Sequence, residues 1–203
     1  MIDSVWASDE WQLCSARRTH ADAVWAFVRA NPQFEQLVSG GLGERDAMLD
    51  EFFDSVPPPH MPYGKLHKLV LLRGAQVEGL VDVTVDLLAR GVWHVGLFQI
   101  GEAHWGTGLA QRVYAALEGW MLQGGAQWLR LGVVAQNLRG ERFWLRQGYQ
   151  RIGSRHGVAM GRLHNTVHVM LKPVPPQTPG GYFAAQSHDV FDDAFTPSSR
   201  DSA

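Results

Sequence analysis

The 203-residue chain has little of what marks secreted, membrane-bound or nucleic-acid-binding proteins. It contains one cysteine, Cys14, so no disulfide can form within the chain, and a reducing cytoplasm is the expected location. No apolar run reaches the length of about 18 residues typical of a membrane-spanning helix, and Met1–Glu10 lacks the basic segment of a secretory leader. The formal net charge of −2 gives no reason to expect binding to nucleic acid or to an anionic membrane.

Metal-ligand spacing is also missing, because His104 and His164 have no neighbouring ligands in the sequence, so we expect no metal site. What remains is a globular composition, 45% apolar and 19% charged. The composition changes after Lys172, where prolines and glycines become frequent. We therefore predict one domain over residues 1–173 and a tail over residues 174–203. The tail is either disordered or docks its aromatic side chains on the domain or on a second subunit of a homodimer.

Apolar patterning predicts an α+β domain. The expected strands are Trp11–Ala16, His67–Arg73, Val77–Leu88, Val92–Ile100, Trp128–Val134, Tyr149–Ser154 and Thr166–Lys172. The expected helices run from Thr19 or His20 to Ala30, then after an interruption at Asn31-Pro32 to Leu37, from Glu44 to Phe53, from Leu109 past Met121, and from Leu138 to Gln147.

The most informative segment is the glycine loop between strand Val92–Ile100 and the helix that begins at Leu109. Its sequence is Trp105-Gly106-Thr107-Gly108-Leu109-Ala110. Small residues at a helix N-terminus leave backbone N–H groups unpaired, and these suit a phosphate group. A tight strand–helix turn without a ligand would need the same glycines. The loop lacks the Gly-Lys-Ser/Thr of a P-loop, and Gln111 replaces the third small residue of a dinucleotide fingerprint.

The loop resembles the Q/R-x-x-G-x-G/A motif of the GCN5-related N-acetyltransferases, or GNATs. Gly108 and Ala110 match this motif, whereas Trp105 replaces its usual Gln or Arg. A second segment, from Asn137 to Tyr149, resembles the family's N-x-x-A-x-x-F-Y-x-x-x-G-F, with Gly140 as the small residue. The resemblance implies a GNAT fold, in which a mixed, splayed sheet is flanked by helices on both faces.

The resemblance also implies acetyl-CoA as co-substrate and an amine acceptor on a small molecule or peptide. Strand residues Phe98, Gln99 and Ile100 would lie along the pantetheine arm, and the Ile100 N–H would polarise the thioester carbonyl. Asn137 would contact the cofactor, although an Asn in this position could instead cap the next helix. The backbone amides that would hold the pyrophosphate are those of Trp105, Gly106, Thr107, Gly108, Leu109 and Ala110.

The acid–base groups are less defined by the sequence. Trp144, which we also expect to contact the cofactor, stands where the family usually has the Tyr that protonates the thiolate, and an indole cannot release a proton near neutral pH. Water or another residue would then do so, or the thiolate would leave unprotonated. For the base we favour His94, because imidazole titrates near neutral pH. The other candidates are Asp82, Asp86 and Glu102. A non-catalytic GNAT-fold module that binds acyl-CoA or a protein partner is the alternative function.

Overall fold

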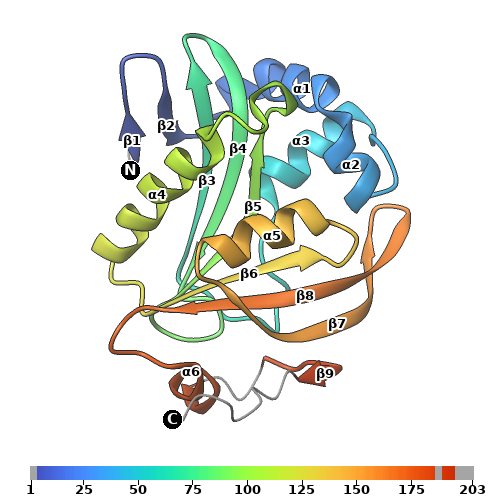
Figure 1. Cartoon of the computed structure of the whole chain (residues 1–203). Coiled ribbons are helices and arrows are strands. Elements are labelled where there is room, and N and C mark those ends of the chain that lie inside the picture. The colour runs from blue at the N-terminus through green and yellow to red at the C-terminus, as the bar shows by residue number, and fades with distance from the viewer. Residues whose placement is uncertain (1–3, 186–188, 195–203) are drawn as a thin grey trace.

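The protein, represented by a computed structural model that describes residues 4–185 and 189–194, is built on one mixed β-sheet (Figure 1). Within the described residues the strand order is β1-β2-β3-β4-β5-β6-β8-β7-β9. The strands are β1 (Trp6–Ala7), β2 (Gln12–Ser15), β3 (Lys65–Arg73), β4 (Gln76–Val85), β5 (Val92–Ile100), β6 (Trp128–Val134), β7 (Gln150–Met160), β8 (Leu163–Pro173) and β9 (Asp193–Ala194). The α-helices are α1 (Ala21–Ala30), α2 (Pro32–Val38), α3 (Arg45–Asp54), α4 (Leu109–Gln123), α5 (Leu138–Arg146) and α6 (Pro179–Ala185).

The sheet opens between β5 and β6. These two strands are parallel and pair only from Val92 opposite Trp128 to Val95 opposite Leu131. Beyond Val95, the described part of the chain supplies no strand partner for this edge of β5. Gly96 is a bulge residue, since Asp82 of β4 pairs with Leu97 and the next residue of β4 pairs with Val95. The result is a splayed sheet with an exposed backbone edge along the second half of β5.

Helices cover both faces of the sheet, as predicted. Helices α4 and α5 lie on the near face in Figure 1, where Val113, Leu117 and Met121 of α4 are fully buried against the sheet. Helices α1 and α3 cover β2, β3 and β4 on the other face, with Phe27 and Phe52 buried there. Among the described residues, every helix is too short or too polar to cross a membrane.

The tail continues the fold on that second face. Residues 179–185 form α6, whose Tyr182 is fully buried beside Trp128 and Leu171, and β9 pairs with β7. Figure 1 shows both elements beneath β7 and β8. Of the two alternatives for residues 174–203, docking on the domain describes residues 174–185 and 189–194, while residues 186–188 and 195–203 lie outside the described part.

Several predicted boundaries differ from the observed ones. Strand β4 ends at Val85 because Asp86 adopts a left-handed backbone (φ 55°) and its carboxylate accepts a hydrogen bond from Gly91 N–H at 2.6 Å. Strands β7 and β8 extend beyond the predictions and meet in a two-residue turn, since Met160 pairs with Leu163. Gly161 has the positive φ (57°) that such a turn requires. Polar residues and Gly157 interrupt the apolar alternation in this hairpin, so the apolar pattern did not predict its full length.

Candidate active site

The glycine loop presents backbone donors to open space. Gly106 and Gly108 both have left-handed backbones, with φ of 77° and 82°, and among the described residues no heavy atom beyond the adjacent ones in the chain lies within 4 Å of the position where either would carry a Cβ. Thr107 fixes the loop, because its hydroxyl donates to the His104 carbonyl at 2.8 Å and accepts from Leu109 N–H at 3.3 Å. The N–H groups of Gly106, Gly108 and Ala110 find no acceptor among the described residues. An anion can therefore approach them at the N-terminus of α4.

The Ile100 amide faces the open side of β5. Gly101 N–H donates to the Glu78 carbonyl on β4 at 2.9 Å, and successive amides of an extended chain point to opposite sides. The Ile100 N–H therefore points away from β4. The Ile100 carbonyl accepts a hydrogen bond from Trp105 Nε1 at 3.1 Å, which ties the glycine loop to the end of the strand.

Helix α5 forms the opposite wall. Asn137 caps this helix, since its Oδ1 accepts from Gly140 N–H at 2.9 Å. A Cβ on residue 140 would lie 2.6 Å from Asn137 Nδ2, so a larger residue there would require the Asn137 amide to shift. The capping role left open by the sequence is thus the one observed, although Asn137 also lines the cavity described next.

These elements enclose a cavity of about 290 Å³. Of the predicted cofactor residues, it is lined by Phe98, Gln99, Ile100, Trp105, Gly106, Gly108, Ala110, Asn137 and Trp144. Thr107 and Leu109 do not line it, because the Thr107 hydroxyl is bonded within the loop and the Leu109 side chain is buried in the core. The structure therefore brings most of the predicted set together.

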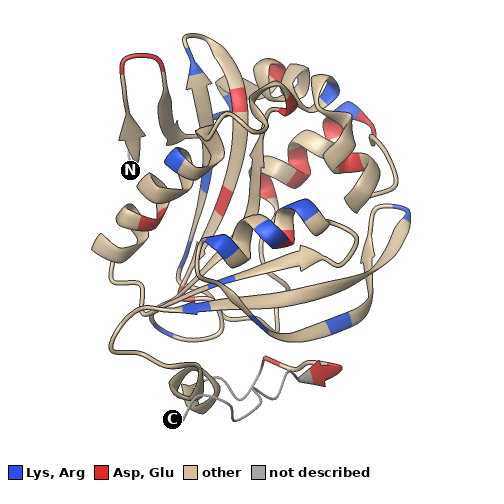
Figure 2. Ribbon diagram, viewed as in Figure 1, with Lys and Arg blue, Asp and Glu red and all other residues tan. Residues whose placement is uncertain are grey.

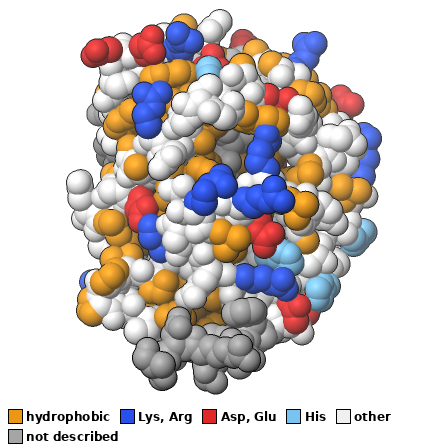
Figure 3. Space-filling view, viewed as in Figure 1, with side chains coloured by type: hydrophobic (Ala, Val, Ile, Leu, Met, Phe, Trp, Pro, Cys, Tyr) orange, Lys and Arg blue, Asp and Glu red, His pale blue; other side chains and the backbone are white. Residues whose placement is uncertain are grey.

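Two arginines that we did not predict also line this cavity. Arg139 and Arg146 lie seven residues apart on α5 and share one face of the helix. The Arg139 guanidinium stacks on the Trp105 indole, 3.0 Å from the ring centroid, and this contact joins α5 to the glycine loop. Figure 2 marks basic positions along α5, and Figure 3 shows Lys and Arg side chains at the centre of the same view. Their i, i+7 spacing in the sequence could have predicted that Arg139 and Arg146 share a helix face.

Trp144 belongs to an aromatic cluster at the base of the cavity. Its ring is 7% exposed, and its centroid lies 5.4 Å from Phe98, 5.2 Å from Tyr114 and 5.4 Å from Tyr149. The Tyr114 hydroxyl donates to the Tyr149 hydroxyl at 2.9 Å, and burial raises the pKa of both phenols. Neither phenol is therefore poised to release a proton near neutral pH.

A second cavity, of about 630 Å³, meets the first at Phe34 and Gln99, which line both. Helix α2 separates the two cavities. Gln33 and Leu37 face the first cavity, whereas Glu35 and Val38 face the second. Because Gln99 is adjacent to Ile100, the junction lies beside the outward-facing amide at the end of β5.

The second cavity combines apolar walls with carboxylates. Burial raises the pKa of Glu35, and the Ser39 hydroxyl, 3.2 Å away, partly opposes this shift. On the opposite wall, Asp82 accepts a hydrogen bond from Lys68 Nζ at 2.7 Å, and its other oxygen is buried without a partner in the described structure. Burial raises the pKa of Asp82 while Lys68 lowers it. Asp86, in contrast, lies in a turn beyond the strand.

The tip of the β7–β8 hairpin closes one side of this cavity. Arg162 N–H donates to the Ser39 carbonyl at 2.9 Å, and Asn165 Nδ2 donates to the Val38 carbonyl at 2.8 Å. Gly161 packs so closely that a Cβ there would lie 2.6 Å from the Ser39 carbonyl oxygen. The hairpin and the end of α2 thus form a continuous roof.

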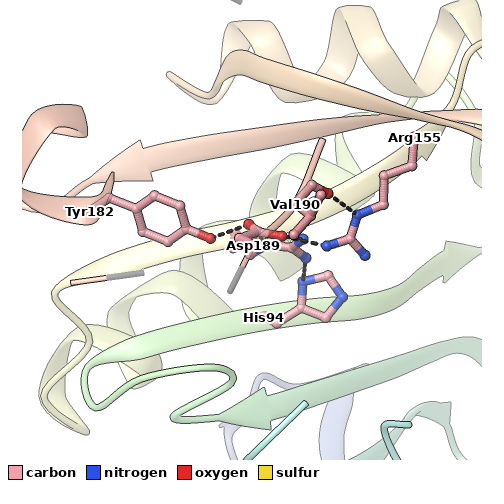
Figure 4. Close-up of polar contacts among 6 residues, drawn as sticks. His94, Arg155, Tyr182, Asp189 and Val190 are labelled. Atoms are coloured by element: carbon pink, nitrogen blue, oxygen red, sulfur yellow. Dashed lines mark hydrogen bonds and ion pairs between the residues drawn. The ribbon is translucent and has the colours of Figure 1, made fainter. Parts of the chain in front are cut away.

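His94 lies outside both cavities, in a polar cluster shown in Figure 4. Its Nδ1 accepts a hydrogen bond from Arg130 Nη1 at 3.2 Å. Arg130 also donates to both carboxylate oxygens of Asp189, at 3.0 and 2.8 Å. Desolvation, followed by the Arg130 charge, lowers the pKa of His94 to about 3. We therefore do not assign His94 the role of base, since its environment disfavours proton uptake.

The carboxylate and the backbone N–H of Glu102 both make hydrogen bonds that hold neighbouring segments together. It lines the first cavity, and its carboxylate accepts from Gln33 N–H at 3.0 Å while its N–H donates to Asn31 Oδ1 at 2.6 Å. These bonds join the start of α2 to the loop after β5. Within the described residues, no three His, Cys, Asp or Glu side chains are grouped as a metal site would need.

Comparisons with known proteins give the family. The profile of the acetyltransferase (GNAT) family matches residues 44–149. No curated protein sequence matches the chain. A solved acetyltransferase from Thermus thermophilus is 16% identical with a TM-score of 0.65, covering 84% of this chain and 99% of that one. A probable acetyltransferase of the GNAT family from Chromobacterium violaceum is 16% identical with a TM-score of 0.68, covering 84% and 90%.

A third solved structure, an acetyl transferase from Salmonella typhimurium, modifies the N-terminal serine of the ribosomal protein L7/L12. It is 12% identical with a TM-score of 0.65, covering 86% of this chain and 99% of that one. These identities show a shared fold. With the family match over more than half of its length, the chain belongs to the GNAT acetyltransferase family and has the α+β GNAT fold.

Proposed function

We propose that the protein transfers the acetyl group of acetyl-CoA to a primary amine by direct attack. The observation that carries this proposal is the pair of cavities that meet at Phe34 and Gln99. One offers unpaired amides and arginines to an anionic cofactor, and the other offers carboxylates to a cationic acceptor. Such an arrangement holds two reactants end to end, which is a large part of catalysis in transfer reactions.

The hydrogen-bond donors that line the first cavity suit the anionic phosphates of acetyl-CoA. The glycine-loop amides and the Arg139 and Arg146 guanidinium groups would hold the phosphates. The open edge of β5 would pair with the amides of the pantetheine arm, and the Ile100 N–H would donate to the acyl carbonyl oxygen. When bound, acetyl-CoA supplies an activated acyl group on a thiolate leaving group.

The transfer itself would take place where the two cavities meet. Attack by the neutral amine forms the N–C bond, the C–S bond breaks, and one proton leaves the nitrogen while the thiolate gains one. Trp144 lines the first cavity, which we call the cofactor cavity. Its indole can donate a hydrogen bond, but not a proton, to the sulfur. Water at the junction would therefore supply the thiolate proton.

The first test separates binding from turnover. Calorimetry and thermal unfolding with acetyl-CoA should show specific binding, and a concentration 100 times the Kd should add about 2.7 kcal/mol to the free energy of unfolding. Thiol release in the presence of amines should show turnover. Absence of acetyl-CoA binding by a folded protein would contradict the proposal.

A non-catalytic module is the second candidate function. It is favoured by Trp144, which stands where the family usually has a tyrosine that can protonate the leaving thiolate. Tight acetyl-CoA binding without thiol release, across primary amines of several classes, would support this candidate over the enzyme.

A further inference from the structure

Glu35 differs from the other carboxylates around the second cavity, which we call the acceptor cavity. Glu51 of α3 is solvent-exposed, and Asp82 of β4 is paired with Lys68 of β3. Glu35 is partly buried, and its hydrogen-bond partner among the described residues is the neutral Ser39 hydroxyl. It is therefore the carboxylate of this cavity that lacks a cationic partner while being removed from bulk water.

The position of Glu35 next to Phe34 is also specific. Phe34 lines both cavities, so the next residue on α2 stands at the acceptor side of the junction. Proline at the first position of α2 and the hydrogen bond from Gln33 N–H to Glu102 fix the start of this helix. A buried carboxylate without a counter-charge is costly, and an ammonium group in the cavity would relieve that cost.

The walls around Glu35 are mostly apolar and include Trp25, Val28, Leu42, Phe52, Leu97 and Met160. A cavity of about 630 Å³ is in the size range of sites for small organic molecules. The roof formed by Arg162 and Asn165 against the end of α2 encloses this space on one side. Both features favour a compact acceptor over an extended polypeptide.

We infer that the acceptor is a small monoamine cation with an apolar body, and that Glu35 binds its ammonium group and removes its proton. This inference rests on the proposed acetyl transfer. One proton passes from the nitrogen to the Glu35 carboxylate, and the freed lone pair attacks the acyl carbon. The N–C bond forms, the C–S bond breaks with its electron pair going to sulfur, and the second proton lost by the nitrogen reaches the thiolate through water. Glu35 thus joins recognition to activation of the nucleophile.

The pH dependence follows from the surroundings of Glu35. Burial and the neighbouring Glu51 raise its pKa above the usual 4.5, and Ser39 lowers it. The other charged groups that face the cavity are Lys68, Asp82 and Arg162. Because the base acts as a carboxylate, activity should fall on acidification at a higher pH than a solvated glutamate would give.

The experiment compares the wild type, Glu35→Gln and the control Glu44→Gln, which makes the same change at an exposed residue outside the cavity. The acceptors are 2-phenylethylamine, spermidine and an alanine-initiated hexapeptide amide. The readouts are kcat/KM from thiol release between about pH 5 and 9, and the Kd of acetyl-CoA from calorimetry.

For Glu35→Gln we expect a loss of kcat/KM of about 100-fold with 2-phenylethylamine, with the acetyl-CoA Kd within about threefold of wild type. Protonation of the amine itself changes kcat/KM with pH in all three proteins. In wild type and Glu44→Gln, kcat/KM should show an additional fall on acidification, and Glu35→Gln should lack this additional fall. Wild-type kcat/KM should be at least about tenfold higher for 2-phenylethylamine than for the other acceptors.

Near-wild-type activity of Glu35→Gln would overturn the role of Glu35, and preference for the hexapeptide or spermidine would overturn the acceptor class. A wild type that binds acetyl-CoA but releases no thiol with any of the three acceptors would favour the non-catalytic module and overturn the proposed transfer together with this inference. A wild type that does not bind acetyl-CoA would instead overturn the proposed function.

Discussion

Trp144 is the single residue whose chemistry differs most from the family pattern. Its indole is packed against Phe98, Tyr114 and Tyr149 and also lines the cofactor cavity. The ring therefore serves the core and the site together. Its N–H can stabilise a sulfur anion by a hydrogen bond, whereas proton release would need a pKa far lower than that of indole.

We predict that Trp144→Phe retains most of the turnover, because the lost N–H is at most one hydrogen bond to the sulfur. Trp144→Tyr, which restores the usual family residue, should raise kcat, by up to about 100-fold if the phenol reaches the sulfur. Steady-state thiol release with calorimetric acetyl-CoA binding measures both. A hundredfold loss of kcat in Trp144→Phe at unchanged KM would contradict this, since the indole would then act in the transition state.

His94 and Glu35 show why single-residue roles were the hardest part to predict. The chemistry of imidazole near neutral pH suggested a base at position 94, but that property depends on Arg130 and Asp189, which come from β6 and the tail. Glu35 carries no local signature, because its environment is assembled from α2, α3 and a distant hairpin. A residue's pKa is set by these long-range contacts, which one sequence does not reveal.

At the scale of elements, the unit formed by β5, the glycine loop and α4 was predictable almost completely. The predicted bounds of β5 and β6 are those observed, and α4 begins at Leu109 as expected. These elements depend on local signals, namely a β-branched apolar run, loop glycines and helical apolar spacing. All three lie within about 30 consecutive residues. The hairpin and α6 depend instead on contacts far along the chain.

This unit gives a direct prediction for the cofactor. Gly108→Glu should abolish acetyl-CoA binding, since it places a carboxylate where the loop amides would meet a phosphate. Gly108→Gln is the matched control, because it imposes the same backbone strain at a φ of 82° without the charge. Calorimetry should show a larger loss for Gly108→Glu than for Gly108→Gln, with circular dichroism reporting the fold. Equal affinity for wild type and Gly108→Glu would contradict the location of the site.

The whole molecule is held together partly by its own C-terminal segment. Asp189, whose side chain is fully buried, accepts hydrogen bonds from Arg130, Arg155 and Tyr182, and Figure 4 shows Arg155 and Tyr182 on either side of it. The attraction of Arg130 lowers the pKa of Asp189 despite its burial. A short segment after α6 therefore neutralises a guanidinium that the sheet would otherwise bury alone.

Asp189→Ala should lower the free energy of unfolding by about 3–5 kcal/mol, because it leaves Arg130 buried without its counter-charge. Asp193→Ala, which breaks an exposed pair with Arg151 in the same segment, should cost about 1 kcal/mol or less. Denaturant unfolding measures both variants.

Acetyl-CoA affinity should stay within about threefold in both variants, or about 0.7 kcal/mol, since among the described residues none after Arg146 lines the cofactor cavity. Similar losses of stability in the two variants would contradict the structural role of Asp189. A large loss of affinity in a folded variant would show that the segment acts on the site.

The division of labour between the two cavities has a consequence for how such a protein can change over generations. Apart from Phe34 and Gln99, the two cavities have separate linings among the described residues, and α1, α3 and the tip of the β7–β8 hairpin line the second cavity alone. Under the proposed function, mutations in these segments would alter which amine fits while the glycine loop is inherited unchanged. The walls contributed by α1 and α3 are thus the natural place for a lineage to acquire a new substrate, whereas Gly161 is held by its positive φ and its close contact with Ser39.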